Sequence, residues 1–122
     1  MPLVNPIHQD AALTSLQNSL EQIWLCPNDP ADYATANTTK LVAITLSPGD
    51  FSLMNGDIDG RKLHYNGNTG IANAAGTVTR AVFVNVTNTT IEFVNNITST
   101  AVASGGQVTV NPFDIWEVGN PT

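Results

Sequence analysis

One stretch of the sequence decides the fold, Val78-Thr79-Arg80-Ala81-Val82-Phe83-Val84-Asn85-Val86. It is rich in β-branched and aromatic residues and alternates with a period of two, which is typical of a β-strand. Phe83 and Val84 are both large and apolar, and consecutive residues of a strand face opposite sides of the sheet. The stretch therefore predicts a central strand that is buried on both faces.

Shorter strands are predicted on both sides of this stretch, separated by turns rich in Asn, Gly and Pro. They cover residues 23–26, 41–46, 61–65, 90–94, 97–103, 108–110 and 113–118. Among these residues, Ile91 and Phe93 are expected on one face, Asn95-Asn96 in a turn, and Asn66-Gly67 in a hairpin-type turn. Short strands at regular spacing are typical of sandwiches and barrels. The sequence therefore predicts a mainly β fold, a small β-sandwich or jelly-roll-like domain.

A short N-terminal α-helix is predicted over residues 10–22. Asp10 is a suitable N-cap, and apolar residues follow at spacings that place them on one helical face. These residues are Leu13, Leu16, Leu20 and Ile23. A single further helical turn is expected over 31–36, because Pro30 suits a first helical position. We expect residues 10–122 to form a single β-rich domain that starts with the longer helix.

Residues 1–9 are predicted to form an extended N-terminal arm. Pro2 and Pro6 each fix φ and remove a backbone donor, which disfavours a helix and a central strand. Two interpretations are open: a frayed terminus, or an arm that lies on a partner protein. In the second interpretation the contacts are the three apolar side chains of the arm, Leu3, Val4 and Ile7.

Composition argues against several classes of function. Only 11% of the 122 residues are charged, and four Lys and Arg against ten Asp and Glu give a net charge of −6. Four cations neutralise few phosphates, so we expect no nucleic-acid partner. No apolar run approaches the ~20 residues that cross a membrane, and no secretory signal is visible. Thr and Asn, 15 and 14 residues, take the place of charges and make a surface that is easily desolvated against another protein.

The sequence carries no motif that indicates an enzyme. Cys26 is the only cysteine, so no internal disulfide and no CxxC site can form, and we interpret it as an inert small hydrophobe. The two histidines, His8 and His64, have no spacing that indicates a Ser-His-Asp triad. We therefore expect no catalytic residue, no cofactor and no metal.

The segment Asn55-x-Asp57-x-Asp59-Gly60 resembles the opening of a calcium loop. Oxygen ligands stand at positions 1, 3 and 5, and Gly stands at position 6. Position 12, where a bidentate Glu should close such a site, is Asn66. We interpret the segment as a plain turn whose carboxylates are balanced locally by Arg61 and Lys62.

Four aromatic residues are candidates for either the core or an interface, namely Trp24, Tyr33, Phe113 and Trp116. Core packing is the ordinary role, but Trp and Tyr often dominate binding energy at interfaces. Trp116 is the better interface candidate, because it lies in a last strand that is expected at a sheet edge.

Several motifs follow one another along residues 10–122. They are Ile23-Trp24-Leu25-Cys26 with Asn28-Asp29-Pro30-Ala31-Asp32-Tyr33, Leu46-Ser47-Pro48-Gly49-Asp50-Phe51 with Gly56-Asp57-Ile58-Asp59-Gly60-Arg61-Lys62, Ala81-Val82-Phe83-Val84 with Ile91-Glu92-Phe93-Val94 and Gly105-Gly106-Gln107-Val108, and Phe113-Asp114-Ile115-Trp116-Glu117-Val118-Gly119-Asn120-Pro121-Thr122. In this order the chain resembles a family of small structural proteins of tailed bacteriophages and prophages. That family tends to end in an aromatic-Asp-Ile-Glu-Ile pattern, from which Trp116 departs, so we expect a shifted register in the last strand.

The resemblance implies a virion component without enzyme activity. Our hypothesis is a capsid decoration (cement) protein, a trimer made in the host cytoplasm that binds the major capsid protein on the outer surface of the head and stabilises the shell. A tail, baseplate or fibre-associated adaptor, a carbohydrate-binding surface module and a hydrolase are the alternatives. The predicted partner contacts are Leu3, Val4, Ile7 and Trp116.

Overall fold

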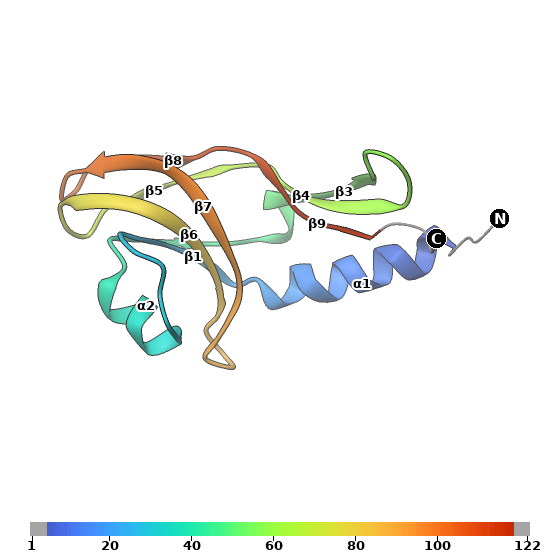
Figure 1. Ribbon diagram of the computed structural model, residues 1–122, viewed down its shortest axis with the longest axis horizontal. Coiled ribbons are helices and arrows are strands. Elements are labelled where there is room, and N and C mark those ends of the chain that lie inside the picture. Colours follow the sequence, from blue (N-terminus) through green and yellow to red (C-terminus); the bar gives the residue numbers. More distant parts are fainter. Residues whose placement is uncertain (1–4, 119–122) are drawn as a thin grey trace. The chain divides into compact units, whose positions relative to one another are not determined.

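The computed structural model describes residues 5–118 and confirms a mainly β fold with an N-terminal α-helix (Figure 1). Its strands form three antiparallel sheets, in the orders β2-β1-β6-β7, β3-β4-β9 and β5-β8. The described elements are α1 (Pro6–Ser19), β1 (Gln22–Cys26), α2 (Tyr33–Thr39), β2 (Val42–Thr45), the 3-10 helix η1 (Pro48–Asp50), β3 (Phe51–Asn55), β4 (Arg61–Tyr65), β5 (Asn68–Ile71), β6 (Gly76–Asn85), β7 (Thr90–Val102), β8 (Gln107–Val110) and β9 (Phe113–Val118).

The elements group into two compact units, each assembled from separate segments of the chain. Among the described residues, unit 1 takes 5–18, 47–67 and 111–118, and unit 2 takes 19–46 and 68–110. Because the segments of the two units alternate along the chain, no single cut in the sequence separates them. The expectation of a single domain over residues 10–122 stays a prediction.

Unit 2 is built around the predicted central strand, which the structure confirms. Strand β6 lies between β1 and β7, and its residues Phe83 and Val84 are both fully buried. On one face, Phe83 packs against Phe93 of β7, with 5.7 Å between the ring centroids. On the other face, Val84 joins a cluster with Trp24 of β1 and Ala36 of α2. Trp24 is therefore a core residue, and α2 covers this face of the sheet.

Strand β7 differs from the prediction in two respects. The turn expected at Asn95-Asn96 is wrong, because β7 is one long strand that continues through both residues and pairs with β6. The expectation that Ile91 and Phe93 share a face is also wrong. A register shift in the ladder leaves Glu92 as an extra residue, so Ile91 and Phe93 pair with consecutive residues of β6 and lie on opposite faces.

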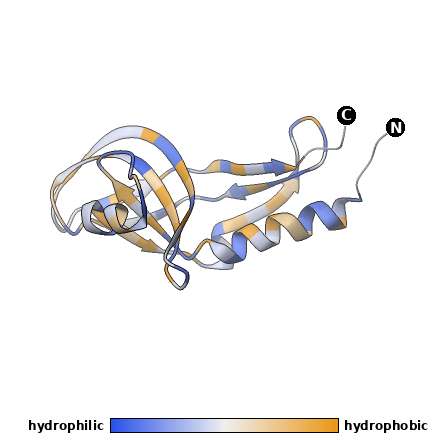
Figure 2. Cartoon of the chain, turned by 60° about the horizontal axis from the view of Figure 1, so that its bottom comes forward, coloured by the Kyte–Doolittle hydropathy of each residue, from blue (hydrophilic) through white to orange (hydrophobic). Residues whose placement is uncertain are grey.

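Unit 1 combines α1 with the sheet β3-β4-β9. In β4, Leu63 and Tyr65 are fully buried and share one face with Arg61. Arg61 reaches α1 through an ion pair with Asp10, with 2.7 Å between Nε and Oδ1. Helix α1, whose Leu13 is fully buried, therefore covers this face of the sheet. Figure 2 shows both hydrophobic and hydrophilic residues along these strands, as expected for a sheet with one covered face.

Helix α1 begins earlier than the sequence predicted. Pro6 is its first residue, so the extended arm expected over 1–9 is wrong for residues 6–9. The physical reason is a cap: Asn5 Oδ1 accepts a hydrogen bond from the backbone N of Ile7 at 3.0 Å, and Pro6 needs no donor at the first helical position. Asp10, the expected N-cap, instead lies inside the helix.

Two further helix boundaries and one expected hairpin turn also differ from the prediction. Helix α1 ends at Ser19, so Ile23 of the expected helical stripe is a strand residue in β1 of unit 2. The second helix, α2, begins at Tyr33 because Asp32 caps it, accepting a hydrogen bond at Oδ1 from the backbone N of Thr35. The Asn66-Gly67 dipeptide does not close a hairpin: β4 pairs with β3 and β9, whereas β5 pairs with β8.

Candidate functional site

The sheet of unit 1 carries a polar network on the face opposite α1. Lys62 and His64 alternate with the buried residues of β4, so their side chains belong to this opposite face. Glu117 and Asp114 of β9 lie across the ladder from Lys62 and His64, respectively. The sheet therefore separates its apolar packing from a group of charged side chains that comes from two neighbouring strands.

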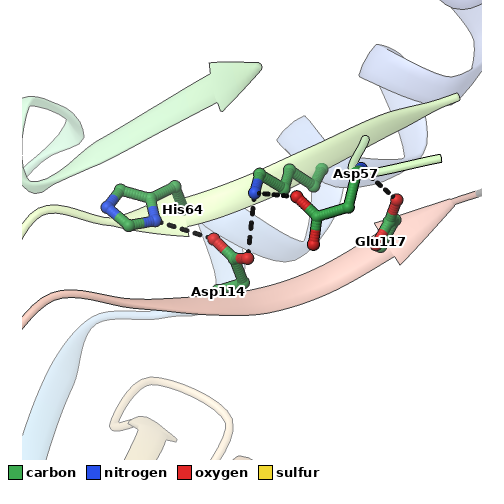
Figure 3. Close-up of polar contacts among 5 residues, drawn as sticks. Asp57, His64, Asp114 and Glu117 are labelled. Atoms are coloured by element: carbon green, nitrogen blue, oxygen red, sulfur yellow. Dashed lines mark hydrogen bonds and ion pairs between the residues drawn. The ribbon is translucent and has the colours of Figure 1, made fainter. Parts of the chain in front are cut away.

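Lys62 is the centre of this network, in which Figure 3 labels Asp57, His64, Asp114 and Glu117. Its Nζ lies 2.7 Å from Asp57 Oδ1 and 3.0 Å from Asp114 Oδ2, and its side chain is only 13% exposed. Asp114 uses its other oxygen to bind His64 Nδ1 at 2.8 Å. The bond from His64 and then that from Lys62 lower the pKa of Asp114, while the two carboxylates raise the pKa of Lys62. The ammonium group of Lys62 therefore lies between the carboxylates of Asp57 and Asp114.

The network reaches the loop of residues 56–60, which connects β3 to β4. Gly56 N donates to Gly60 O at 2.9 Å, and Glu117 Oε1 accepts a hydrogen bond from Asp57 N at 2.7 Å. Gly60 has a φ of +70°, in the left-handed region that favours glycine. A Cβ atom at Gly56 would lie 2.0 Å from a backbone oxygen of the loop, so a larger residue does not fit without a shift. These contacts fix the path of the loop from both ends.

The loop displays Ile58 to solvent. This residue is 96% exposed, the highest value among the exposed large apolar residues of the described chain. Its neighbours Asp57 and Asp59 are also exposed. Sequence reasoning missed Ile58 because it treated the segment as an ion loop or a plain turn. The signal was present, namely an isoleucine between two aspartates in a loop bounded by glycines.

The oxygen atoms that resemble calcium ligands bind cations of the chain itself. Asn55 Oδ1 accepts a hydrogen bond from Arg61 Nη1 at 2.8 Å, and Asp57 Oδ1 binds Lys62. The predicted local balance by Lys62 is thus confirmed, whereas Arg61 forms its ion pair with Asp10. Within residues 5–118, no group of three or more His, Cys, Asp or Glu side chains is placed to hold a metal ion.

Two of the four predicted partner contacts lie in the described part of the chain, both in unit 1. Ile7 is 67% exposed in the first turn of α1. Trp116 is 47% exposed in β9, which lies at an edge of its sheet as expected. Leu3 and Val4 lie outside the described residues. The role of all four as contacts stays a prediction.

A β-bulge in β9 decides which way Trp116 faces. Asp114 pairs with His64, but Trp116 pairs with Leu63, which leaves Ile115 as an extra residue. The last strand thus carries a register shift just before Trp116. Without the shift, Asp114 and Trp116 would share a face; with it, Trp116 shares the face of Leu63, at the exposed edge of the sheet.

The other candidate residues take structural positions. Cys26 is fully buried, and burial raises the pKa of its thiol, which disfavours the reactive thiolate. Phe113 packs against Tyr65 with 5.4 Å between the ring centroids, and Tyr33 packs against Trp24 at 5.0 Å. His8 lies exposed on α1, within the same unit as the network but outside its contacts.

Comparisons of the chain with protein-family models, with curated proteins and with solved structures found no match. The resemblance to phage structural proteins therefore depends on the order of its motifs alone. In the part of the chain that the structure describes, no helix is both long enough and apolar enough to span a membrane.

Substitution of Gly56 tests whether the 56–60 loop has the closely packed backbone that the structure shows. We expect Gly56→Ala to lower the free energy of unfolding by about 1–3 kcal/mol, because its Cβ would overlap the loop backbone. The matched control is Gly49→Ala in η1, where a Cβ meets nothing within 4 Å, and there the change stays within ~0.5 kcal/mol or stabilises. Denaturant unfolding measures both, and equal effects of the two variants would contradict the described loop.

Calcium tests whether the loop is an ion site. We expect the thermal midpoint to be the same in ~1 mM calcium as in ~1 mM magnesium. The reason is that Arg61 and Lys62 already bind two of the candidate ligand oxygens. A site with a Kd of ~0.1 mM would add about 1.4 kcal/mol under these conditions, a shift of several degrees. Differential scanning fluorimetry measures the midpoint. A rise of that size in calcium but not in magnesium would show that calcium displaces Arg61 and Lys62 from these oxygens, which would contradict the prediction.

Asp114 should contribute stability that disappears in acid. Its pKa is lowered in the folded state, so the contribution is present above the unfolded value of ~3.9 and is lost as the pH falls through the folded pKa. We expect the difference in thermal midpoint between the wild type and Asp114→Asn to be largest near neutral pH and to shrink below about pH 4. The measurement is thermal unfolding of both chains across this range, and a difference independent of pH would be inconsistent with an ionised Asp114 in the network.

Proposed function

We propose that the chain is a structural protein of a tailed phage, and more specifically a capsid decoration protein. In this proposal a trimer binds the major capsid protein on the outer surface of the head and has no enzyme activity. Three features support it: the order of motifs along residues 10–122, the weakly charged surface, and the apolar residues that unit 1 exposes.

The exposed apolar residues of unit 1 carry the proposal. Of the six large apolar residues exposed in the described chain, four belong to this unit: Ile7, Met54, Ile58 and Trp116. They come from α1, β3, the 56–60 loop and β9, so each stands on a different part of one small scaffold. In the proposal these residues are contacts with the partner, because large apolar and aromatic side chains often dominate the binding energy of an interface.

The remaining surface suits a protein that covers a large partner. With only 11% charged residues, few ions have to lose their hydration when the surface is buried. Thr and Asn hydroxyl and amide groups can still form hydrogen bonds at the rim of such an interface. A protein of this kind binds the assembled shell and not its separate subunits, and it stabilises the shell by mass action. Many copies then add their separate contributions through multivalency.

Copy number in purified virions tests the proposal. We expect quantitative mass spectrometry, calibrated against the major capsid protein, to find the chain in hundreds of copies per particle, because a decoration protein occupies sites over the whole shell. A count between a few and a few dozen would contradict decoration and favour a vertex, portal or tail component. Complete absence from virions would exclude a structural role in the head and in the tail alike.

A further inference from the structure

We propose that Ile58 is an anchor that inserts into an apolar pocket on the partner protein, and that Lys and Arg side chains rim this pocket. The inference rests on the proposed function for the identity of the partner, the major capsid protein. It adds the point of contact and the chemistry of the receiving surface.

Ile58 is exposed on a loop, residues 56–60, whose position is fixed by contacts with two strands. Glu117 of β9 binds the backbone N of Asp57 at 2.7 Å, and Lys62 of β4 binds the carboxylate of the same residue at 2.7 Å. Ile58 follows immediately and is 96% exposed, so it stands next to the residue that both strands hold. Ordering a loop before binding lowers the entropy that association removes. Burying an exposed isoleucine then strengthens binding in proportion to the apolar area removed from water.

Charge identifies the kind of surface that receives the anchor. Unit 1 carries six Asp and Glu against two Lys and Arg, a formal charge of −4 out of −6 for the whole chain. Two of these acids flank Ile58 directly: Asp57, which Lys62 binds, and Asp59. Complementary potentials favour a pocket with basic side chains around its mouth. A second copy of unit 1 carries the same negative charge and is disfavoured as the occupant.

The test uses the full chain and phage heads assembled without it. Labelled wild-type chain is titrated onto the heads, together with Ile58→Ser, Ile58→Leu and the control Ile71→Ser, an exposed isoleucine of unit 2. We expect Ile58→Ser to weaken binding by about tenfold to a hundredfold, and Ile58→Leu and Ile71→Ser to stay near the wild type. Thermal unfolding confirms that the variants fold, since an isoleucine as exposed as Ile58 contributes little packing that a smaller side chain would remove.

A second series tests the basic rim. Wild-type binding is measured at ~0.1 M and ~1 M salt, where charges are screened beyond roughly 10 Å and 3 Å. Asp59→Asn is compared with Asp29→Asn, an exposed aspartate of unit 2. We expect binding to weaken in high salt, and Asp59→Asn to bind more weakly and to lose part of that salt dependence, whereas Asp29→Asn behaves as the wild type.

The outcomes separate the two proposals. If the wild type does not bind heads, the proposed function is wrong and the major capsid protein is not the partner. If the wild type binds and Ile58→Ser binds equally well, the anchor alone is wrong. If Ile58→Ser weakens binding but wild-type binding does not depend on salt, the anchor holds and the proposed rim of Lys and Arg side chains is wrong. If Ile58→Ser instead lowers the oligomeric state of the free chain, the occupant is a second copy and the inference is overturned.

Discussion

The ion pairs of Lys62 connect the 56–60 loop of unit 1 to strand β9. One side chain on β4 binds Asp57 in the loop and Asp114 in β9, so the loop and the edge strand share a single cation. Exposed ion pairs contribute little to stability, but Lys62 is largely covered and binds two carboxylates at once. Its main effect is therefore geometric. Without it, two carboxylates would stand near each other with no cation between them.

Much of the fold could be predicted from local patterns, and the exceptions have physical causes. The alternation around Phe83 and Val84 correctly identified a central strand, because burial on both faces leaves apolar neighbours in sequence. The missing backbone donor of Pro6 predicts an extended arm, but with Asn5 before it the same residue starts a helix, where no donor is needed. The faces of Ile91 and Phe93 depend on a bulge, which is set by pairing with β6 and has no local signature in the sequence.

The candidate site was predictable only in part. Trp116 could be placed on an edge strand from its position, but its face follows from the extra residue Ile115, which no alternation rule includes. The local balance of Asp57 by Lys62 was predictable from the sequence. The ion pair of Arg61 with Asp10, and the second ion pair of Lys62, with Asp114, depend on tertiary contacts across more than fifty residues. Ile58 was overlooked because the oxygen-bearing residues around it directed the interpretation to an ion loop or a plain turn, although an isoleucine between two aspartates was visible in the sequence.

In the proposed contact, the acidic residues around Ile58 act in two ways: they disfavour self-association and they favour a basic partner. An isoleucine displayed to water attracts any apolar surface, including that of a second copy, and is a liability for solubility. Charges beside such a residue oppose self-association, because two copies bring like charges together. The same charges do not oppose a basic partner and instead raise the rate of encounter with it. An apolar contact alone would bind many apolar surfaces without selectivity. Acidic residues alone would attract a basic partner only weakly, because salt screens exposed charges. In the proposed contact, Ile58 supplies affinity and the acidic residues beside it on the 56–60 loop supply selectivity.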